Sequence, residues 1–276
     1  MTAPETLASG KGAGDENFPV ASWILKPQHR TPVMAFYHFA RVADDVADHE
    51  SAPPEEKLRL LGEMRKGLLG EGSASGEAAQ LAAVMASHNL HTQHALDLLI
   101  AFERDVTKTR YADWDELMDY CRYSAMPVGR YVLDVHGEDR ATWPASDALC
   151  AALQVINHLQ DCGKDFRTLN RVYIPLDTGI EIDELAKSCA TPNLRAIIID
   201  LAIRAETLLA QSSEFSAQIK DHRLALEVAV IHRLAVSLTA RLKRFDPLSE
   251  RVHHTKLESF GLAALAALGQ AGRLIR

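Results

Sequence analysis

Two aspartate-rich segments carry the residue types best suited to chemistry in this chain. The first is Arg41-Val-Ala-Asp44-Asp45-Val-Ala-Asp48. Residues three or four apart lie on one face of a helix, so Asp44 and Asp48 share a face and Arg41 lies one turn before Asp44. Carboxylates stacked one turn apart raise each other's pKa unless a cation lies between them. The spacing therefore indicates either a divalent-cation site or a solvated face with ordinary ion pairs.

The second segment, Asn157-His-Leu-Gln-Asp161-Cys-Gly-Lys-Asp165, has a spacing of four and four. Asn157, Asp161 and Asp165 form one polar stripe, and the turns that precede it are apolar. A stripe that points inward is costly unless it has a partner. Mg²⁺ takes oxygen ligands and shares its coordination shell with substrate phosphates. Two acidic faces opposed across a helical bundle therefore predict a metal cluster that holds a diphosphate.

Two weaker features lie between these segments. Asp105 precedes an Arg-Tyr pair and is a possible further ligand. Farther along, Pro127 and Gly129 interrupt an apolar helical pattern, and Pro127 cannot donate a hydrogen bond to the carbonyl of Tyr123. The interruption predicts either a plain helix end or a bend that turns Tyr120 and carbonyl dipoles toward a pocket, and the sequence favours neither.

Helices must position these residues. Apolar residues recur at three- and four-residue spacing along almost the whole chain, and alternating strand patterns are nearly absent. Turn-forming residues divide the chain at 53–54, 70–76, 137–144, 170–179, 192 and 246–247. These breaks predict an all-α fold of roughly eight to ten helices. Residues 171–175 are expected to form an extended loop, because the segment is short and ends in proline.

Composition excludes several classes of protein. The chain has 276 residues, of which 47% are hydrophobic and 24% charged, which is typical of a globular protein rather than a disordered or collagen-like one. Its net charge of −7 disfavours nucleic-acid binding, which requires clustered Lys and Arg. No two of its four cysteines have CxxC spacing, and no uninterrupted stretch of about 18 apolar residues predicts a membrane-spanning helix. The expected compartment is the reducing cytoplasm.

One domain accounts for these patterns. Residues 1–16 are polar and acidic and are expected to be a loose tail, whereas residues 17–276 are expected to form one helical domain. Near the C-terminus, residues 257–276 carry apolar side chains at helical spacing together with two arginines. This segment predicts either a helix docked on the bundle or a helix that lies on a membrane surface.

Histidine spacing provides a possible second metal site. His88, His91 and His94 recur every three residues, but no acidic or Cys residue shares their register. The pattern therefore predicts an exposed helix side rather than a metal site.

Together, four of these motifs resemble the squalene and phytoene synthase family of trans-isoprenoid enzymes. They are the runs 41–48, 120–129 and 157–165 and the loop 171–175, and the match extends from about residue 17 to about residue 175 with weaker similarity beyond. The resemblance is closest to the branch that forms hydroxysqualene in the hopanoid pathway. It implies a single isoprenoid-synthase-type helical bundle with a central active-site cavity.

The resemblance also implies a reaction and roles for individual residues. Mg²⁺-dependent ionisation of presqualene diphosphate, rearrangement of the cation and capture by water would give hydroxysqualene, and aromatic walls would stabilise the cation. The implied metal ligands are Asp44, Asp48, Asp105, Asn157, Asp161 and Asp165. Catalytic roles fall to Asp44, Asp48, Tyr120, Asp161 and Asp165, and the implied substrate contacts are Arg41, Asp45, Lys164, Arg171, Tyr173 and Phe36.

Two alternatives stay open. A farnesyl-coupling enzyme of the same family would form presqualene diphosphate, squalene, dehydrosqualene or phytoene. The second alternative is a non-catalytic assembly or binding factor on the same fold, although two intact carboxylate faces argue against it. The expected partners are presqualene or farnesyl diphosphate, other enzymes of the pathway and the inner face of the membrane, with no nucleic acid.

Overall fold

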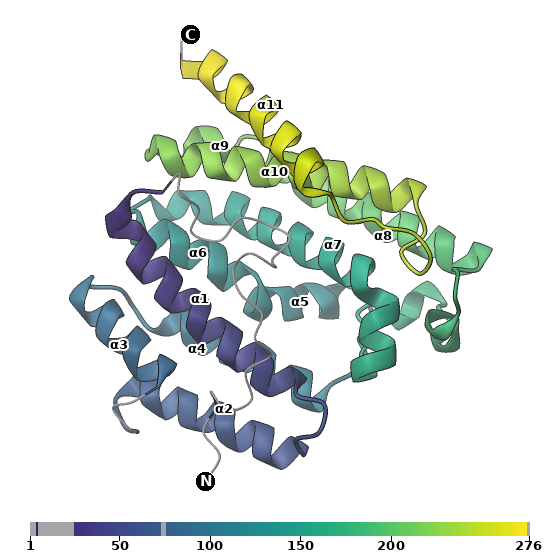
Figure 1. Ribbon diagram of the computed structural model, residues 1–276, viewed down its shortest axis with the longest axis horizontal. Helices are drawn as coiled ribbons and strands as arrows, with labels where there is room; N and C mark the ends of the chain where they lie inside the picture. Colours follow the sequence, from purple (N-terminus) through teal and green to yellow (C-terminus); the bar gives the residue numbers. More distant parts are fainter. Residues whose placement is uncertain (1–3, 5–24, 73–75, 275–276) are drawn as a thin grey trace. The chain divides into compact units, whose positions relative to one another are not determined.

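The computed structural model of this chain describes Pro4 and residues 25–72 and 76–274, with side chains up to residue 267. Within these ranges the chain forms eleven α-helices and short 3₁₀ turns, and its only β-type pairing there is an isolated bridge between Arg110 and Val172 (Figure 1). The prediction of an all-α fold is confirmed. The expected tail, residues 1–16, lies outside the described residues except for Pro4.

The α-helices follow the predicted breaks closely. Their bounds are α1 Pro27–Asp48, α2 Pro54–Leu69, α3 Glu77–Ser87, α4 Gln93–Thr107, α5 Trp114–Ser124, α6 Met126–Val135, α7 Trp143–Leu169, α8 Pro192–Gln211, α9 Phe215–Gln218, α10 His222–Arg244 and α11 Lys256–Leu274. The 3₁₀ turns are η2 Arg140–Thr142, η3 Leu176–Thr178 and η4 Ile182–Ala186. Proline opens α2 and α8, because its fixed φ suits the first turn of a helix. The extended loop expected at residues 171–175 is confirmed.

The described residues fall into two compact units. Unit 1 comprises residues 1–108 and 122–138, and unit 2 comprises residues 109–121 and 139–276. The expectation of one domain over residues 17–276 stays a prediction.

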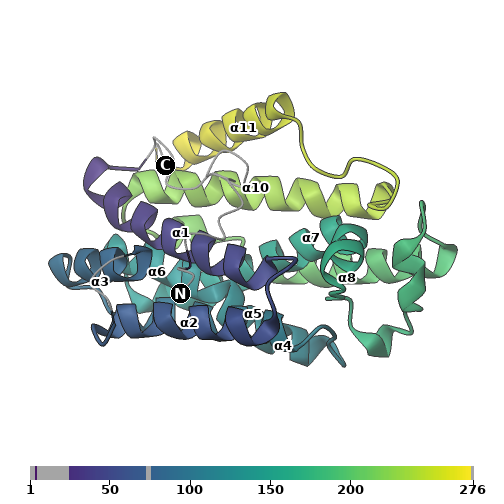
Figure 2. The same cartoon turned by 60° about the horizontal axis from the view of Figure 1, so that its bottom comes forward.

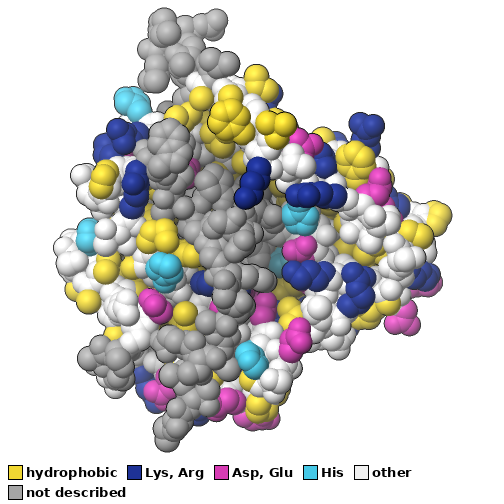
Figure 3. Space-filling view, in the orientation of Figure 1, with side chains coloured by type: hydrophobic (Ala, Val, Ile, Leu, Met, Phe, Trp, Pro, Cys, Tyr) yellow, Lys and Arg dark blue, Asp and Glu magenta, His cyan; other side chains and the backbone are white. Residues whose placement is uncertain are grey.

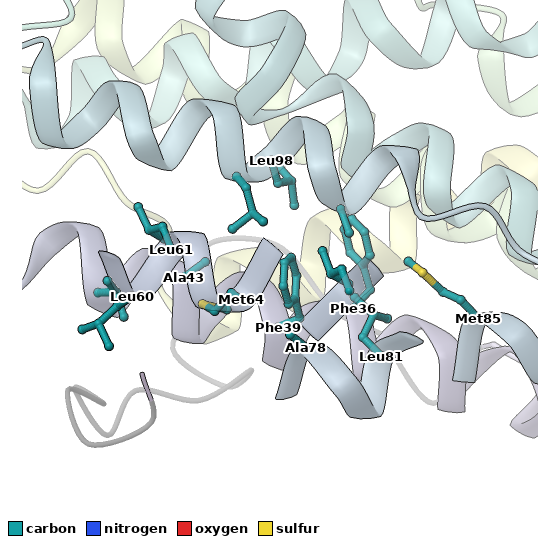
Figure 4. Close-up of a cluster of buried hydrophobic side chains, with 14 of the residues drawn as sticks. Phe36, Phe39, Ala43, Leu60, Leu61, Met64, Ala78, Leu81, Met85 and Leu98 are labelled. Atoms are coloured by element: carbon teal, nitrogen blue, oxygen red, sulfur yellow. The ribbon is translucent and has the colours of Figure 1, made fainter. Parts of the chain in front are cut away.

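In unit 1, α1 packs against α2, α3, α4 and α6 (Figure 1). The core between these helices is aliphatic and aromatic, because each helix turns one apolar stripe inward. Figure 4 draws 14 residues of this cluster and labels Phe36, Phe39, Ala43, Leu60, Leu61, Met64, Ala78, Leu81, Met85 and Leu98. Full burial of one large apolar side chain contributes about 1.5–3 kcal/mol, so this cluster fixes α1, which carries the first acidic run, and α4, which carries Asp105.

In unit 2, α7 packs against α8, and α10 lies between α8 and α11 (Figure 2). The long helix α7 ends at Leu169 because Asn170 adopts the left-handed conformation, with φ of 51°. The amide of Asn170 donates to the Phe166 carbonyl at 3.0 Å, and the amide of Arg171 donates to the Asp165 carbonyl at 3.2 Å. These bonds close the last turn of α7 and direct the chain into the loop 171–175.

The C-terminal helix α11 packs on α10, as the docked alternative predicts. It nevertheless leaves large apolar side chains in solvent: Leu257 is 81% exposed, Phe260 74% and Leu265 54%. Figure 3 shows hydrophobic side chains gathered over this helix. Among the described residues, no helix has both the length and the apolar character needed to span a bilayer.

The histidine pattern at 88–94 was misread as one helix side, and the structure corrects it. The helix α3 ends at Ser87, and Asn89 is left-handed with φ of 54°. His88 therefore caps α3, whereas His94 is buried in α4 with its Nε2 3.0 Å from Asp134 Oδ2. His88 and His91 are exposed as predicted, but the single helix side is wrong because the helix breaks inside the pattern, and the acidic partner of His94 lies 40 residues farther along the chain.

Candidate active site

The first acidic face lies on the last turns of α1. Asp44 and Asp48 are one helical turn apart, as their spacing predicts, and both are half-buried. Arg41, one turn earlier, forms ion pairs with Asp44 and with Asp45, the latter between Nη2 and Oδ1 at 2.8 Å. Because Asp45 is buried, this pairing compensates a charge that would be costly alone.

Asp105 of α4 joins this face. It is buried, and it lies close enough to Asp44 to raise the pKa of that carboxyl group. The largest causes of the raised pKa of Asp44 are its burial and the negative charge of Asp48, and the guanidinium of Arg41 acts in the opposite direction. Carboxylates that resist ionisation in this way are stabilised by a divalent cation, so this donor set fits Mg²⁺.

The second acidic face lies on α7 in unit 2. Asn157, Asp161 and Asp165 fall on successive turns of this one helix, and all three are half-buried. Lys164 is exposed. The Nε2 atom of His253, on the connection between α10 and α11, lies 3.8 Å from Asp161 Oδ1. The structure thus keeps the predicted stripe on one helix and adds a histidine beside its middle carboxylate.

Neither face alone supplies a complete set of protein ligands for a metal ion. Within the described ranges, no group of three or more His, Cys, Asp or Glu side chains is placed to hold a metal ion. Mg²⁺ usually keeps several waters and binds through one or two carboxylates together with substrate phosphates. The oxygen donors of these faces therefore suit a metal that binds together with a phosphorylated substrate.

An aromatic cluster in unit 2 surrounds His158, the residue that follows Asn157 on α7. The imidazole of His158 stacks on Tyr173 with ring centroids 3.5 Å apart and an interplanar angle of 13°. Tyr120 lies 5.4 Å from Tyr173 and 5.9 Å from His158. Tyr111 stacks on Tyr173 at 5.6 Å. The electron-rich faces of such rings favour positive charge.

Two chain segments that are distant in sequence hold this cluster in place. Residues 109–112 run beside residues 170–177. The bonds between them join the Val172 amide to the Thr109 carbonyl at 2.9 Å, the Leu176 amide to the Tyr111 carbonyl at 2.9 Å, and Arg110 Nη2 to Asn170 Oδ1 at 2.7 Å. They fix the loop that carries Arg171, which is buried, and Tyr173.

Comparison with known proteins adds a decisive observation. The sequence profile of the squalene/phytoene synthase family matches residues 12–258, which is most of the chain. This chain belongs to the squalene/phytoene synthase family.

The relatives extend this result over nearly the full length. The hydroxysqualene synthase of Zymomonas mobilis is 56% identical over 270 residues, covering 96% of this chain and 91% of that protein. The hydroxysqualene synthase of Rhodopseudomonas palustris is 52% identical over 272 residues, covering 97% and 93%. The crystal structure of a squalene synthase from Alicyclobacillus acidocaldarius superposes with a TM-score of 0.72 at 31% identity, over 87% of this chain and 92% of that one. The helical fold and family that the motifs predict are confirmed.

The structure shows what two predicted features of this squalene/phytoene synthase family member are: the interruption near Pro127 and the position of Phe36. The interruption near Pro127 is a helix end: α5 stops at Ser124, and Pro127 lies in the first turn of α6. Phe36 lies in the core of unit 1, stacked on Tyr131 at 4.0 Å. The structure gives Phe36 a packing role, and its contact with substrate stays a prediction.

Sequence reasoning missed two histidines. His158 follows Asn157 directly on α7, so the four-residue spacing of the stripe does not include it. Burial and the nearby charge of Arg171 lower its pKa to about 3, so its imidazole is neutral at physiological pH. His253 lies on the partly exposed connection between α10 and α11, and its imidazole faces Asp161. The adjacency of His158 to Asn157 was a usable signal, whereas nothing in the sequence links His253 to Asp161.

Proposed function

We propose that this chain converts presqualene diphosphate and water into hydroxysqualene and diphosphate. The observation that carries the proposal is the 56% identity to a hydroxysqualene synthase over nearly the whole of both chains. Both aspartate runs keep their ligand spacing on helices, which supports an enzyme over a non-catalytic factor on the same fold.

The acidic faces of both units bind Mg²⁺ in this proposal. The ligands are Asp44, Asp48 and Asp105 from unit 1 and Asn157, Asp161 and Asp165 from unit 2. When bound, Mg²⁺ acts as a Lewis acid that neutralises the charge developing on the diphosphate oxygens. Arg41, Lys164 and Arg171 donate hydrogen bonds to the diphosphate, and arginine offers two parallel donors for this purpose.

The aromatic cluster protects the cation that remains when the C–O bond breaks. Tyr120 and Tyr173 present ring faces to positive charge. His158 is neutral, so it adds no repulsive charge, and the amide of Gln154 lies 3.1 Å from its Nε2. After rearrangement, water forms the new C–O bond and releases one proton, so that the products are hydroxysqualene and diphosphate.

Product analysis tests the proposal directly. The purified chain is incubated with Mg²⁺ and either presqualene diphosphate or farnesyl diphosphate, and the products are identified by mass spectrometry. We expect hydroxysqualene from presqualene diphosphate alone, and its loss in Asp161→Ala. Presqualene diphosphate, squalene, dehydrosqualene or phytoene would identify a different branch of the family. Absence of turnover of both substrates would favour the non-catalytic alternative.

The proposal extends to the place where the enzyme works. The product is a C30 lipid, and the exposed apolar side chains of α11 offer a contact with lipid. The enzyme therefore lies in the cytoplasm and touches the inner face of the membrane through α11, where other enzymes of the pathway deliver or receive the lipid.

A further inference from the structure

The connection between α10 and α11, residues 245–255, is anchored on unit 2 at several points. Asp246 accepts hydrogen bonds from three groups, which lowers the pKa of its carboxyl despite partial burial. The anchors are Asp246 Oδ2 with the Ala190 amide at 2.8 Å, Arg241 Nε with the Val252 carbonyl at 2.6 Å, Arg241 Nη2 with the Arg251 carbonyl at 3.0 Å, and His254 Nε2 with Ser237 Oγ at 2.9 Å. These hydrogen bonds therefore hold the connection in a defined position on unit 2.

The connection contacts α7 beside the second acidic face. A Cβ atom placed on Gly163 would lie 2.5 Å from Leu248 Cδ2 and 3.4 Å from the Leu185 carbonyl oxygen. With Leu248 in this position, the contact leaves no room for a Cβ atom on residue 163, and a larger residue there would require the Leu248 side chain to move. Gly163 follows Asp161 by two residues. The same contact therefore brings the connection to the middle carboxylate of the stripe.

This placement sets His253 against Asp161. The separation of 3.8 Å between Nε2 and Oδ1 is too long for a direct hydrogen bond but lies within ion-pair range. About a third of each side chain is exposed, 34% for His253 and 36% for Asp161, so a small rotation of either closes the gap. Carboxylates that bind metals are generally oriented by such outer hydrogen-bond partners.

We propose that His253 is a positioning residue for Asp161. Its imidazole directs one oxygen of the carboxylate and thereby orients the group for a divalent cation. This inference rests on the proposed function, because Asp161 is a Mg²⁺ ligand only there. The neighbouring His254 faces Ser237 instead, which makes it a matched control within the same connection.

The test measures cation binding rather than turnover. Mn²⁺ replaces Mg²⁺ as a spectroscopic probe, inorganic diphosphate is present, and free Mn²⁺ is followed by electron paramagnetic resonance at pH 8. We expect His253→Ala to weaken Mn²⁺ binding about 10-fold, the lower end of the range for outer partners of metal ligands. His253→Gln keeps an N–H donor and should stay within about 3-fold of the parent chain, and His254→Gln should not change binding.

Each outcome is decisive. Mn²⁺ binding that falls in Asp161→Ala but is unchanged in His253→Ala overturns the positioning role and leaves the proposed function intact. Binding that is unchanged in Asp161→Ala removes the metal assignment and the positioning role together. Should His253→Ala melt well below the parent chain, His253→Asn, whose side chain is too short to reach Asp161, must show the same weakening in folded protein.

Discussion

Asp44 illustrates how the ionisation of one side chain depends on its neighbours. Burial and Asp48 raise its pKa in the folded chain above the ordinary value of 3.8. Between pH 3.8 and the folded pKa of about 8, the folded chain binds more protons than the unfolded chain, so stability falls as the pH rises through this window. The penalty is absent at low pH and complete above the folded pKa.

We therefore expect Asp44→Asn to stabilise the chain at pH 8.5 in EDTA and to have little effect at pH 4. A gain of about 1 kcal/mol would raise Tm by roughly 2–4 °C in a protein of this size class. Differential scanning calorimetry at the two pH values measures the effect, with Asp177→Asn as an exposed control. Equal shifts at both pH values would show that charge is not the cause.

Cysteine reactivity separates buried from exposed thiols. Burial raises the pKa of Cys121 and of Cys162 to about 12, whereas Cys189 is exposed. The thiolate is the reactive form of a cysteine. A rise of the pKa from the ordinary 9.0 to about 12 lowers the thiolate fraction at pH 8 about 1,000-fold. We expect an aromatic disulfide reagent at pH 8 to modify Cys189 rapidly and to reach Cys121 and Cys162 only in guanidinium. The rapid modification should be absent in Cys189→Ser, and its persistence in that variant would show that another thiol reacts.

At the scale of elements, the C-terminal end of α7 depends on a clamp from a distant segment. Arg110 donates to Asn170 Oδ1 at 2.7 Å, and its guanidinium lies over the Phe166 ring at 5.9 Å. We expect Arg110→Ala to lower the free energy of unfolding by about 1–2 kcal/mol, since hydrogen bonds to charged groups are lost. Arg110→Lys should recover little, because lysine lacks the planar fork. Urea unfolding of the three proteins measures this, and a stable alanine variant would disprove the clamp.

The helices themselves were predictable because their signals are local. Proline and glycine breaks predicted both limits of α2, the start of α8 and the end of α10. The estimated number of helices fell short because the chain also breaks at Ala125 and forms the four-residue helix α9. The interruption near Pro127 predicted either a helix end or a bend, whereas α9 is too short for apolar periodicity to reveal it.

The candidate site was predictable only where its residues share one segment. The spacing of Asp44 with Asp48, and of Asn157 with Asp161 and Asp165, follows from helical geometry alone. Asp105 was a weak candidate because its approach to Asp44 requires the packing of α4 on α1. The histidine partners of Tyr173 and Asp161 depend on chain segments that meet only in the folded unit.

At the scale of the whole molecule, the proposed contact of α11 with a lipid surface can be tested directly. We expect the parent chain to float with vesicles that contain anionic lipid, because apolar side chains enter the headgroup region. Replacing Leu257 and Phe260 by Ser should abolish flotation. Ile203→Ser, which removes an exposed apolar residue of α8 that is 48% accessible, is the matched control. Vesicle binding that survives the double change would place the contact elsewhere.

The stacked rings beside α7 have a practical consequence. Tyr111, Tyr120 and Tyr173 are held in a fixed, asymmetric arrangement with His158. Aromatic rings in such surroundings produce circular dichroism in the near ultraviolet, a signal that vanishes when tertiary packing loosens. The cluster is thus an intrinsic optical reporter at the second acidic face. Ligand arrival there can be followed in the unlabelled protein, and Tyr173→Leu would identify the share of the signal that comes from this stack.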